Sequence, residues 1–431
     1  MSSYRAVLRT PHACRTFGSA LLGRLSYGTV VLSLLLAAKD ATGSYQVAGT
    51  VTALFGLTSV SLSPVRARLV DRYGPRRALV PMAGTYALLL AALAWLSRHP
   101  GASGTALMAL AMAAGCCTPP LGPVMRSLWS VMLPDRLMLQ RAYSLDGVAE
   151  ELLFVSGPLI VGLLVRWATP ATGVAVSAAL VLVGTLALVS SPVARSVMGS
   201  AGSLGRGARP DVVAGQPADE RPRLWSSSLR GVVAVAVGMG VGLGAFELLV
   251  VALADQRHQP GAVPWVLAAS SAGSALGGLA YGAVSWRWPG RRRLPLITAA
   301  LAVTLAATGL APNAYALVAL AALAGAFIAP AITTAYLIAD ESVTPATRVR
   351  AGAWVNTSLN AGTAGGSAVA VLLVERVPVA WCFALVAVPA LLSAVASLEG
   401  RRPRRSRAES TAGAAAAAQA GAEAGAEAGG R

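Results

Sequence analysis

The chain has 431 residues, of which 55% are hydrophobic and 12% are charged. Soluble domains carry about a quarter of charged residues, so this composition excludes an ordinary soluble protein and indicates an integral membrane protein. The net charge of +17 would suit a nucleic-acid-binding protein, but the basic residues form short clusters between long apolar runs. Such clusters are typical of membrane-protein loops, and we expect no nucleic acid among the partners.

Twelve apolar runs are long enough to cross a bilayer, which takes roughly 20 residues. They are continuous, so they predict helices rather than barrel strands. The predicted fold is all-α and integral to the membrane, with twelve transmembrane helices in two six-helix bundles related by pseudo-two-fold symmetry. The runs cover residues 17–38, 45–65, 78–97, 104–131, 143–165, 171–190, 231–253, 263–285, 294–311, 314–338, 352–374 and 379–397.

The segments outside the two bundles, residues 17–190 and 231–397, differ in composition from the spans. Residues 1–16 are a short N-terminal segment, 191–230 are rich in Gly, Ser, Pro and Arg, and 398–431 are a low-complexity tail. We interpret 191–230 as a cytoplasmic linker. With the N-terminus inside, most of the 35 Lys and Arg residues fall on the cytoplasmic side, which places both termini there. We expect a monomer in the plasma membrane.

The turn between the second and third runs is repeated in the other half of the chain. Asp71 is followed by Arg72-Tyr73-Gly74-Pro75-Arg76-Arg77, and the second half has Arg287-Trp288-Pro289-Gly290-Arg291-Arg292, with Trp286 in the place of Asp71. Internal repeats of this kind build transporters whose substrate site lies near the membrane midplane, between two bundles that rock against each other.

On these residues the chain resembles the major facilitator superfamily over residues 10–400. Ala67–Leu79 is similar to the loop motif G-x-x-x-D-R-x-G-R-R of that family. The resemblance implies alternating access and a cytoplasmic latch between the halves. We expect Asp71 to face the eleventh helix near Ala351, because a helix N-terminus attracts an anion. The latch motif comprises Asp71, Arg72, Gly74, Arg76 and Arg77.

The fifth run contains a second motif of the family. Ser156–Gly162 is similar to the fifth-helix motif of the drug–proton antiporters, and it keeps Gly157, Pro158 and Gly162. Leu153 and Val161 replace two other glycines of that motif. The resemblance therefore indicates the antiporter branch less strongly than it indicates the superfamily.

Ionisable side chains inside spans are costly and usually face the interior of the bundle. Folding the fourth and fifth runs as a hairpin brings Arg126 within one turn of both Asp146 and Glu150. We expect an inner ion pair of Arg126 with Asp146, with a purely structural pair as the alternative. By the resemblance, the first and fifth helices are neighbours, so Arg24 is expected to pair with Glu150 or Glu151. Protonation of the acid would then release the arginine.

Other polar or helix-breaking residues within spans are further candidates. Glu247 is the only acid in the apolar part of the seventh run, and we expect it to face the cavity, with an outward position at the headgroups as the alternative. Asn356 and Asn360 lie four residues apart and are candidates for substrate binding or for helix packing. The fourth run contains three prolines, which predict a bend that either frees backbone groups for substrate or has no function: Pro119, Pro120 and Pro123.

The predicted function is proton-coupled export of a small amphipathic compound. The Ala-, Val- and Leu-rich helices favour an apolar or weakly cationic substrate over a sugar. Proton-coupled uptake of a metabolite is the alternative, and a membrane sensor or structural protein on a transporter fold is a third possibility. The three histidines lie near or outside the span ends, the only lysine is Lys39, and the four cysteines lack metal-ligand spacing. We therefore expect no enzyme activity, no metal and no cofactor.

Overall fold

The computed structural model describes residues 4–195 and 225–399, and every regular element in these ranges is helical. Most of the predicted linker 191–230, nearly all of the predicted tail 398–431, and residues 1–3 lie outside the described residues. The prediction of an all-α membrane fold is confirmed, because helices occupy all twelve predicted positions.

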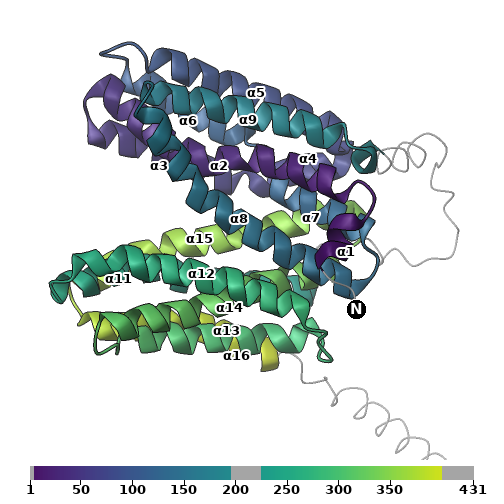
Figure 1. The fold of residues 1–431 in the computed structure, drawn as a ribbon, viewed down its shortest axis with the longest axis vertical. Coiled ribbons are helices and arrows are strands. Elements are labelled where there is room, and N and C mark those ends of the chain that lie inside the picture. Colours follow the sequence, from purple (N-terminus) through teal and green to yellow (C-terminus); the bar gives the residue numbers. More distant parts are fainter. Residues whose placement is uncertain (1–3, 196–224, 400–431) are drawn as a thin grey trace, which may run out of the picture.

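The helices form two bundles, drawn one above the other in Figure 1. The first is preceded by the short α1 (Tyr4–Arg9) and comprises α2 (Ala13–Thr42), α3 (Tyr45–Ser61), α4 (Ser63–Tyr73), α5 (Pro75–Leu96), α6 (Gly104–Cys117), α7 (Leu121–Met132), α8 (Arg136–Val165) and α9 (Pro170–Val189). The second comprises α11 (Ser227–Gln256), α12 (Val263–Ala283), α13 (Gly290–Thr308), α14 (Ala314–Glu341), α15 (Arg348–Val374) and α16 (Val379–Glu399), with 3₁₀ turns at Pro260–Ala262 and Pro345–Thr347.

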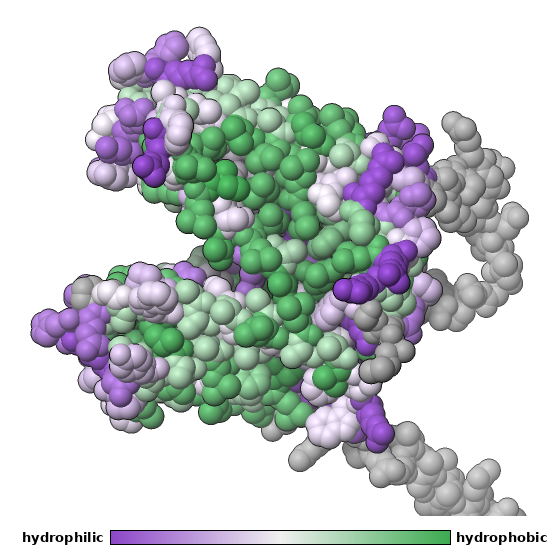
Figure 2. Space-filling model, in the orientation of Figure 1, coloured by the Kyte–Doolittle hydropathy of each residue, from purple (hydrophilic) through white to green (hydrophobic). Residues whose placement is uncertain are grey.

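In the described residues, ten spans are long and apolar enough to cross a membrane, or eleven if α3 and α4 count as one. The remaining predicted position is occupied by α13, which has 19 residues and begins with Gly-Arg-Arg-Arg. It packs against α14 and α16 within the second bundle. Figure 2 shows a broad apolar band over both bundles with polar residues at either end, as expected for a protein surrounded by lipid.

Two of the spans are interrupted. The axes of α3 and α4 meet at 44°, where Ser63 and Pro64 begin α4. Residues Thr118–Pro120 separate α6 from α7, in the region where the prolines predicted a bend. Proline has no N–H and cannot continue a helical hydrogen-bond ladder, so backbone groups are freed at this point. The consequence is that α7 begins inside the span.

Close helix contacts rely on glycine, as expected where lipid provides no hydrophobic drive for helices to associate. A Cβ atom on Gly157 of α8 would overlap the backbone of Gly28 in α2, and one on Gly244 of α11 would overlap Thr363 in α15. Gly162 of the same fifth-helix motif is exposed, and nothing lies within 4 Å of its Cβ position. Gly157 is therefore a packing residue, whereas Gly162 is not.

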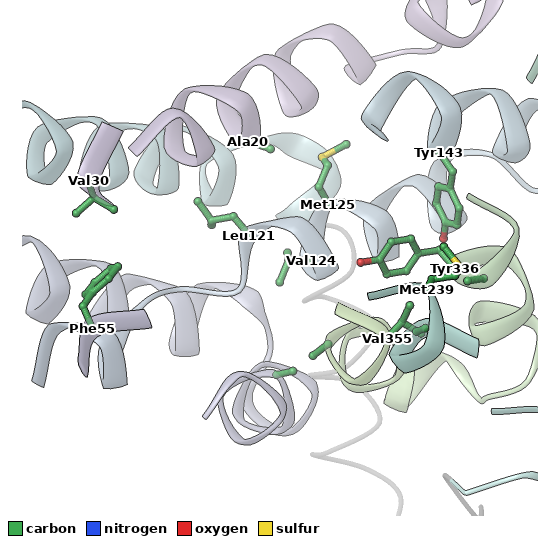
Figure 3. Close-up of a cluster of buried hydrophobic side chains, with 14 of the residues drawn as sticks. Ala20, Val30, Phe55, Leu121, Val124, Met125, Tyr143, Met239, Tyr336 and Val355 are labelled. Carbon is green, nitrogen blue, oxygen red and sulfur yellow. The ribbon is translucent and has the colours of Figure 1, made fainter. Parts of the chain in front are cut away.

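A contiguous cluster of buried apolar side chains extends through both bundles. Figure 3 shows part of this cluster, with Leu121 and Met125 of α7, Tyr143 of α8, and Tyr336, Met239 and Val355 of the second bundle. The two bundles are thus in direct contact, and the candidate functional site lies where they meet.

Candidate transport site

A cavity of about 440 Å³ lies between the bundles. Helices α2, α3, α4, α7 and α8 of the first bundle line it together with α14 and α15 of the second. Figure 2 shows that the space between the bundles opens at the end away from the N-terminus. Each bundle therefore contributes side chains to one shared chamber that is accessible from one end.

Four charged side chains of the first bundle form a closed ring of ion pairs beside this cavity. Arg24 contacts Asp146 (Nη1 to Oδ1, 2.6 Å) and Glu150 (Nη2 to Oε2, 2.9 Å). Arg126 contacts the same two carboxylates, with Nε 3.0 Å from Asp146 Oδ2 and Nη2 2.5 Å from Glu150 Oε2. Each charge thus has two partners of opposite sign, and the ring is electrically neutral.

The members of the ring differ in exposure. The side chain of Asp146 is completely buried, and those of Arg24 and Arg126 are 1% and 6% exposed. That of Glu150 is 30% exposed and lines the cavity. An isolated buried charge is strongly unfavourable, and in the ring each of these groups lies against two groups of opposite sign. Glu150 is therefore the member of the ring that is most accessible from the cavity.

Arg126 also joins the ring to the second bundle. Its guanidinium carbon lies 3.8 Å from the ring centroid of Tyr336 on α14, which is cation–π geometry. The Tyr336 hydroxyl lies 3.5 Å from Asn356 Oδ1 on α15. Asn360 also lines the cavity, and its amide donates to the Asn356 carbonyl oxygen at 2.8 Å. The two asparagines are therefore at the cavity wall, next to the side chain that contacts Arg126.

The other predicted acids lie elsewhere. Glu151 lines the cavity but turns toward α12, where Ser274 Oγ donates to its Oε1, so it does not pair with Arg24. Glu247 is exposed on α11, on the same side as Val237 and Val251, and is not among the residues that line the cavity. The structure therefore does not bring Glu247 to this site, because the glycine-rich face of α11 is the one that packs on α15.

The end of the molecule that holds the N-terminus is closed by contacts between the bundles. Asp71 on α4 accepts hydrogen bonds from the backbone N–H groups of Val349 (3.3 Å) and Arg350 (3.0 Å), in the first turn of α15. Gly74 ends α4 with φ = 82°, a conformation that favours glycine. Arg72, Arg76 and Arg77 are exposed, so Asp71 is the residue of the motif that reaches the other bundle.

The corresponding contact of the second half uses neutral groups and an arginine. Gln140 Nε2 on α8 donates to the carbonyl oxygens of Tyr281 (2.9 Å) and Val284 (3.2 Å) at the end of α12. Arg293 Nη1 donates to Gln140 Oε1 at 3.1 Å. Trp286, which stands where the first half has Asp71, donates within its own bundle to the Tyr281 carbonyl oxygen. The two latches are therefore chemically different.

Sequence reasoning missed one buried charge at the cavity. Arg66 on α4 is 5% exposed and lines the chamber. Arg66 directly follows the apolar run 45–65 and lies five residues before Asp71, a position typical of the basic residues of a loop. Pro64, the second residue of α4, is the sequence signal that the helix continues in a new direction at this point.

Two helical bundles, a chamber between them and latches at one end define the architecture of a secondary transporter. The family model of the Major Facilitator Superfamily matches residues 16–258 and 231–425, and the chain belongs to this superfamily. A search of curated protein sequences found no match.

Several solved structures share the fold. The human organic anion transporter MFSD10 (TETRAN) has a TM-score of 0.67 at 16% identity, covering 92% of this chain and 100% of that one. A bacterial homologue of the iron transporter ferroportin in an outward-facing state has a TM-score of 0.66 at 13% identity, over 89% and 98%. The proton:xylose symporter XylE has a TM-score of 0.63 at 12% identity, over 89% and 95%. At these identities the similarity concerns the fold alone.

Proposed function

We propose that this protein is a secondary active transporter that works by alternating access and exports a small amphipathic compound in exchange for protons, as in the drug–proton antiporter branch. The observation that carries the proposal is the neutral ring of Arg24, Asp146, Arg126 and Glu150 beside the chamber. Binding of a single proton gives this buried, neutral ring a net positive charge. Coupling of transport to protons requires a site whose charge balance changes in this way.

The coupling step starts at Glu150. A proton on its carboxylate leaves two arginines with one carboxylate, and the uncompensated charge is unfavourable in a buried site. Arg126 then loses its contact with Glu150, which is one of the contacts that hold its guanidinium against Tyr336 of the second bundle. Protonation in the first bundle thereby changes a contact between the bundles, and such contacts determine which end of the chamber is open.

The orientation follows from the latches. We take the latched end as cytoplasmic because exposed arginines lie there at the starts of α5 and α13, namely Arg76, Arg77, Arg291 and Arg292. The chamber then opens to the outside, where a proton enters and reaches Glu150. Asp71 stabilises this state by holding the cytoplasmic end of α15. Substrate is captured from the cytoplasm only after the latch has opened. Entry of a proton from outside is therefore followed by export of the compound.

The test is transport in proteoliposomes with an imposed pH gradient and a panel of small amphipathic compounds. We expect counter-movement of protons and compound in the wild type. Glu150→Gln should abolish the pH-driven component but keep exchange of compound across the membrane. Glu375→Gln, which removes an exposed acid just after α15, is the matched control and should behave like the wild type.

The outcomes separate the alternatives. Movement of the compound in the same direction as the proton would establish uptake in place of export. Loss of coupling in Glu151→Gln or Glu247→Gln, with Glu150→Gln unaffected, would move the coupling step away from the ring. Absence of proton flux with every transported compound would refute antiport altogether.

A further inference from the structure

The break between α6 and α7 places the start of a helix at the wall of the chamber. Pro120 precedes the first residue of α7 and provides no side-chain cap, and Leu121 and Gly122 of the first turn line the cavity. In this first turn the Leu121 N–H donates to the Pro119 carbonyl oxygen and Pro123 has no N–H, so among the described residues Gly122 is left with an N–H that has no backbone partner. The helix dipole makes this end positive. In broken transmembrane helices such ends face anionic groups of substrates.

Arg66 adds a full positive charge to the same wall. Its Nη1 donates to the Gly115 carbonyl oxygen in the last turn of α6 at 2.5 Å, and its Nη2 donates to the Ser59 carbonyl oxygen. A guanidinium has five N–H donors. The side chain is 5% exposed, and its Nε is buried without a hydrogen-bond partner. Arg66 therefore retains donor capacity beside the chamber after it has capped α6.

The charge balance of the chamber leaves Arg66 uncompensated. Three arginines line the cavity in the described part of the chain: Arg24, Arg66 and Arg126. Arg24 and Arg126 are neutralised by the ring, whereas Arg66 has no ion pair among the described residues. Glu151, the cavity-lining acid outside the ring, is turned to Ser274 on α12. A buried charge without a counter-ion is unfavourable, so this wall favours an incoming anion.

The groups around this wall fit one end of an amphipathic molecule. The Tyr27 hydroxyl donates to the Pro119 carbonyl oxygen within the break, and Tyr27 lines the same chamber as Arg66. Phe55 of α3, Phe154 of α8 and Ile332 of α14 line the same chamber and provide apolar surface. An anionic head group and an apolar body would each find matching partners in this space.

We propose that the transported compound is an organic anion, whose carboxylate or sulfonate binds between Arg66 and the first turn of α7. This inference rests on the proposed transport function and specifies its substrate class. It replaces the weakly cationic substrate that the apolar composition favoured. The donors are the remaining N–H groups of the Arg66 guanidinium and the backbone N–H of Gly122, which suit an oxyanion better than a neutral or cationic group.

The test is equilibrium binding of three probes that share one fluorophore: dansylglycine, its methyl ester and N-dansylethylenediamine. The purified full-length protein in detergent is titrated at low salt, without a pH gradient, so the result does not depend on coupling. We expect dansylglycine to bind about tenfold more tightly than the ester, because a charge-assisted hydrogen bond is roughly twice as strong as a neutral one. The amine should bind most weakly.

Three variants test whether Arg66 causes the preference for the acid over the ester. Arg66→Gln should reduce the acid-to-ester ratio to about one, and Arg66→Lys should reduce it several-fold because lysine lacks the fork. Arg68→Gln removes the same charge from the exposed side of the same helix and should keep the wild-type ratio. A role of Arg66 limited to capping α6 predicts lower thermal stability of Arg66→Gln with the ratio unchanged.

Each result decides the question. Equal binding of acid and ester by the wild type, or no saturable binding of the acid up to millimolar concentration, overturns the proposal. So does a wild-type ratio in Arg66→Gln or, if that variant does not give monodisperse protein, in Arg66→Lys. A preserved acid preference combined with failed pH-driven transport would instead contradict the proposed coupling and leave the anion site standing.

Discussion

Replacing Asp71 by asparagine removes the charge from the contact between α4 and α15 while the shape of the side chain is kept. The two carboxylate oxygens accept hydrogen bonds from Val349 N and Arg350 N, at 3.3 and 3.0 Å. Asparagine has one acceptor oxygen, so one of the two N–H groups loses its partner. The attraction between a negative charge and the positive end of α15 is lost as well.

The magnitude follows from these two losses. A hydrogen bond to a charged group contributes about 1.5–3 kcal/mol, and a carboxylate at a helix N-terminus about 0.3–1 kcal/mol. Asp71 is only partly buried, which favours the lower values and gives about 2 kcal/mol in total. At 1.4 kcal/mol per factor of ten, the ratio of closed to open molecules at this end should fall about 30-fold.

The assay measures distances between the bundles with a pair of spin labels. Arg76 and Arg292 are exposed at the starts of α5 and α13, and both are replaced by cysteine in a chain that lacks its four native cysteines. Asp71→Asn should increase the population with the longer distance. Asp135→Asn is the control, since Asp135 accepts from Met138 N at 2.8 Å within its own bundle.

The reasoning about the latch is refuted by an unchanged distance distribution in Asp71→Asn together with wild-type transport. An equal change in Asp71→Asn and Asp135→Asn would show a general effect of weakening a helix N-terminus. In either case the loop motif would be only a signal for membrane orientation.

Two further predictions concern packing and the contact between the ring and the second bundle. Gly157→Ala should lower the free energy of unfolding by about 1–3 kcal/mol through overlap with Gly28, whereas Gly162→Ala should leave thermal unfolding in detergent unchanged. Equal effects would exclude the glycine contact as the cause. Tyr336→Phe should transport normally because the ring under Arg126 remains, while Tyr336→Ala loses a contact of about 2 kcal/mol and should slow turnover in proteoliposomes. Equal damage by both variants would assign the role to the hydroxyl.

The features that the sequence predicts well are those set by local patterns. Hydropathy locates the helices, and the prolines locate the break between α6 and α7. Asp71 was expected near Ala351, and in the structure it accepts hydrogen bonds from Val349 N and Arg350 N. This contact could be predicted because the attraction of an anion to a helix N-terminus requires knowing only where α15 begins. Hairpin geometry likewise placed Arg126 opposite Asp146 and Glu150, and both contacts are present.

The direction of side chains around a helix was harder to predict. Glu150 and Glu151 are neighbours in sequence and differ by about 100° around the helix axis, at 3.6 residues per turn. One therefore faces Arg24, whereas the other faces Ser274 in the opposite bundle. From the sequence, either glutamate could be the partner of Arg24. Residue spacing predicts how deep a side chain lies along α8, but it does not predict which neighbouring helix the side chain faces. The same limit applies to Glu247, whose depth was clear and whose direction was not.

The role of Arg66 illustrates a different limit. An arginine just beyond an apolar run has the pattern of a topology signal, and most such residues are solvated. Here the 44° bend between α3 and α4 turns the side chain toward α6, where it is buried. The burial depends on a tertiary contact with Gly115, which no local pattern contains.

The neutrality of the ion-pair ring has an electrical consequence. A proton bound at Glu150 changes the charge of the ring from zero to one, so the protonated carrier responds to the membrane voltage and the unprotonated ring does not. Moving one charge through 100 mV changes the free energy by about 2.3 kcal/mol. If the exported compound is an anion, its outward movement and the inward movement of the proton transfer charge in the same direction. Each cycle then carries two charges, and the resting potential of the cell drives export even without a pH difference.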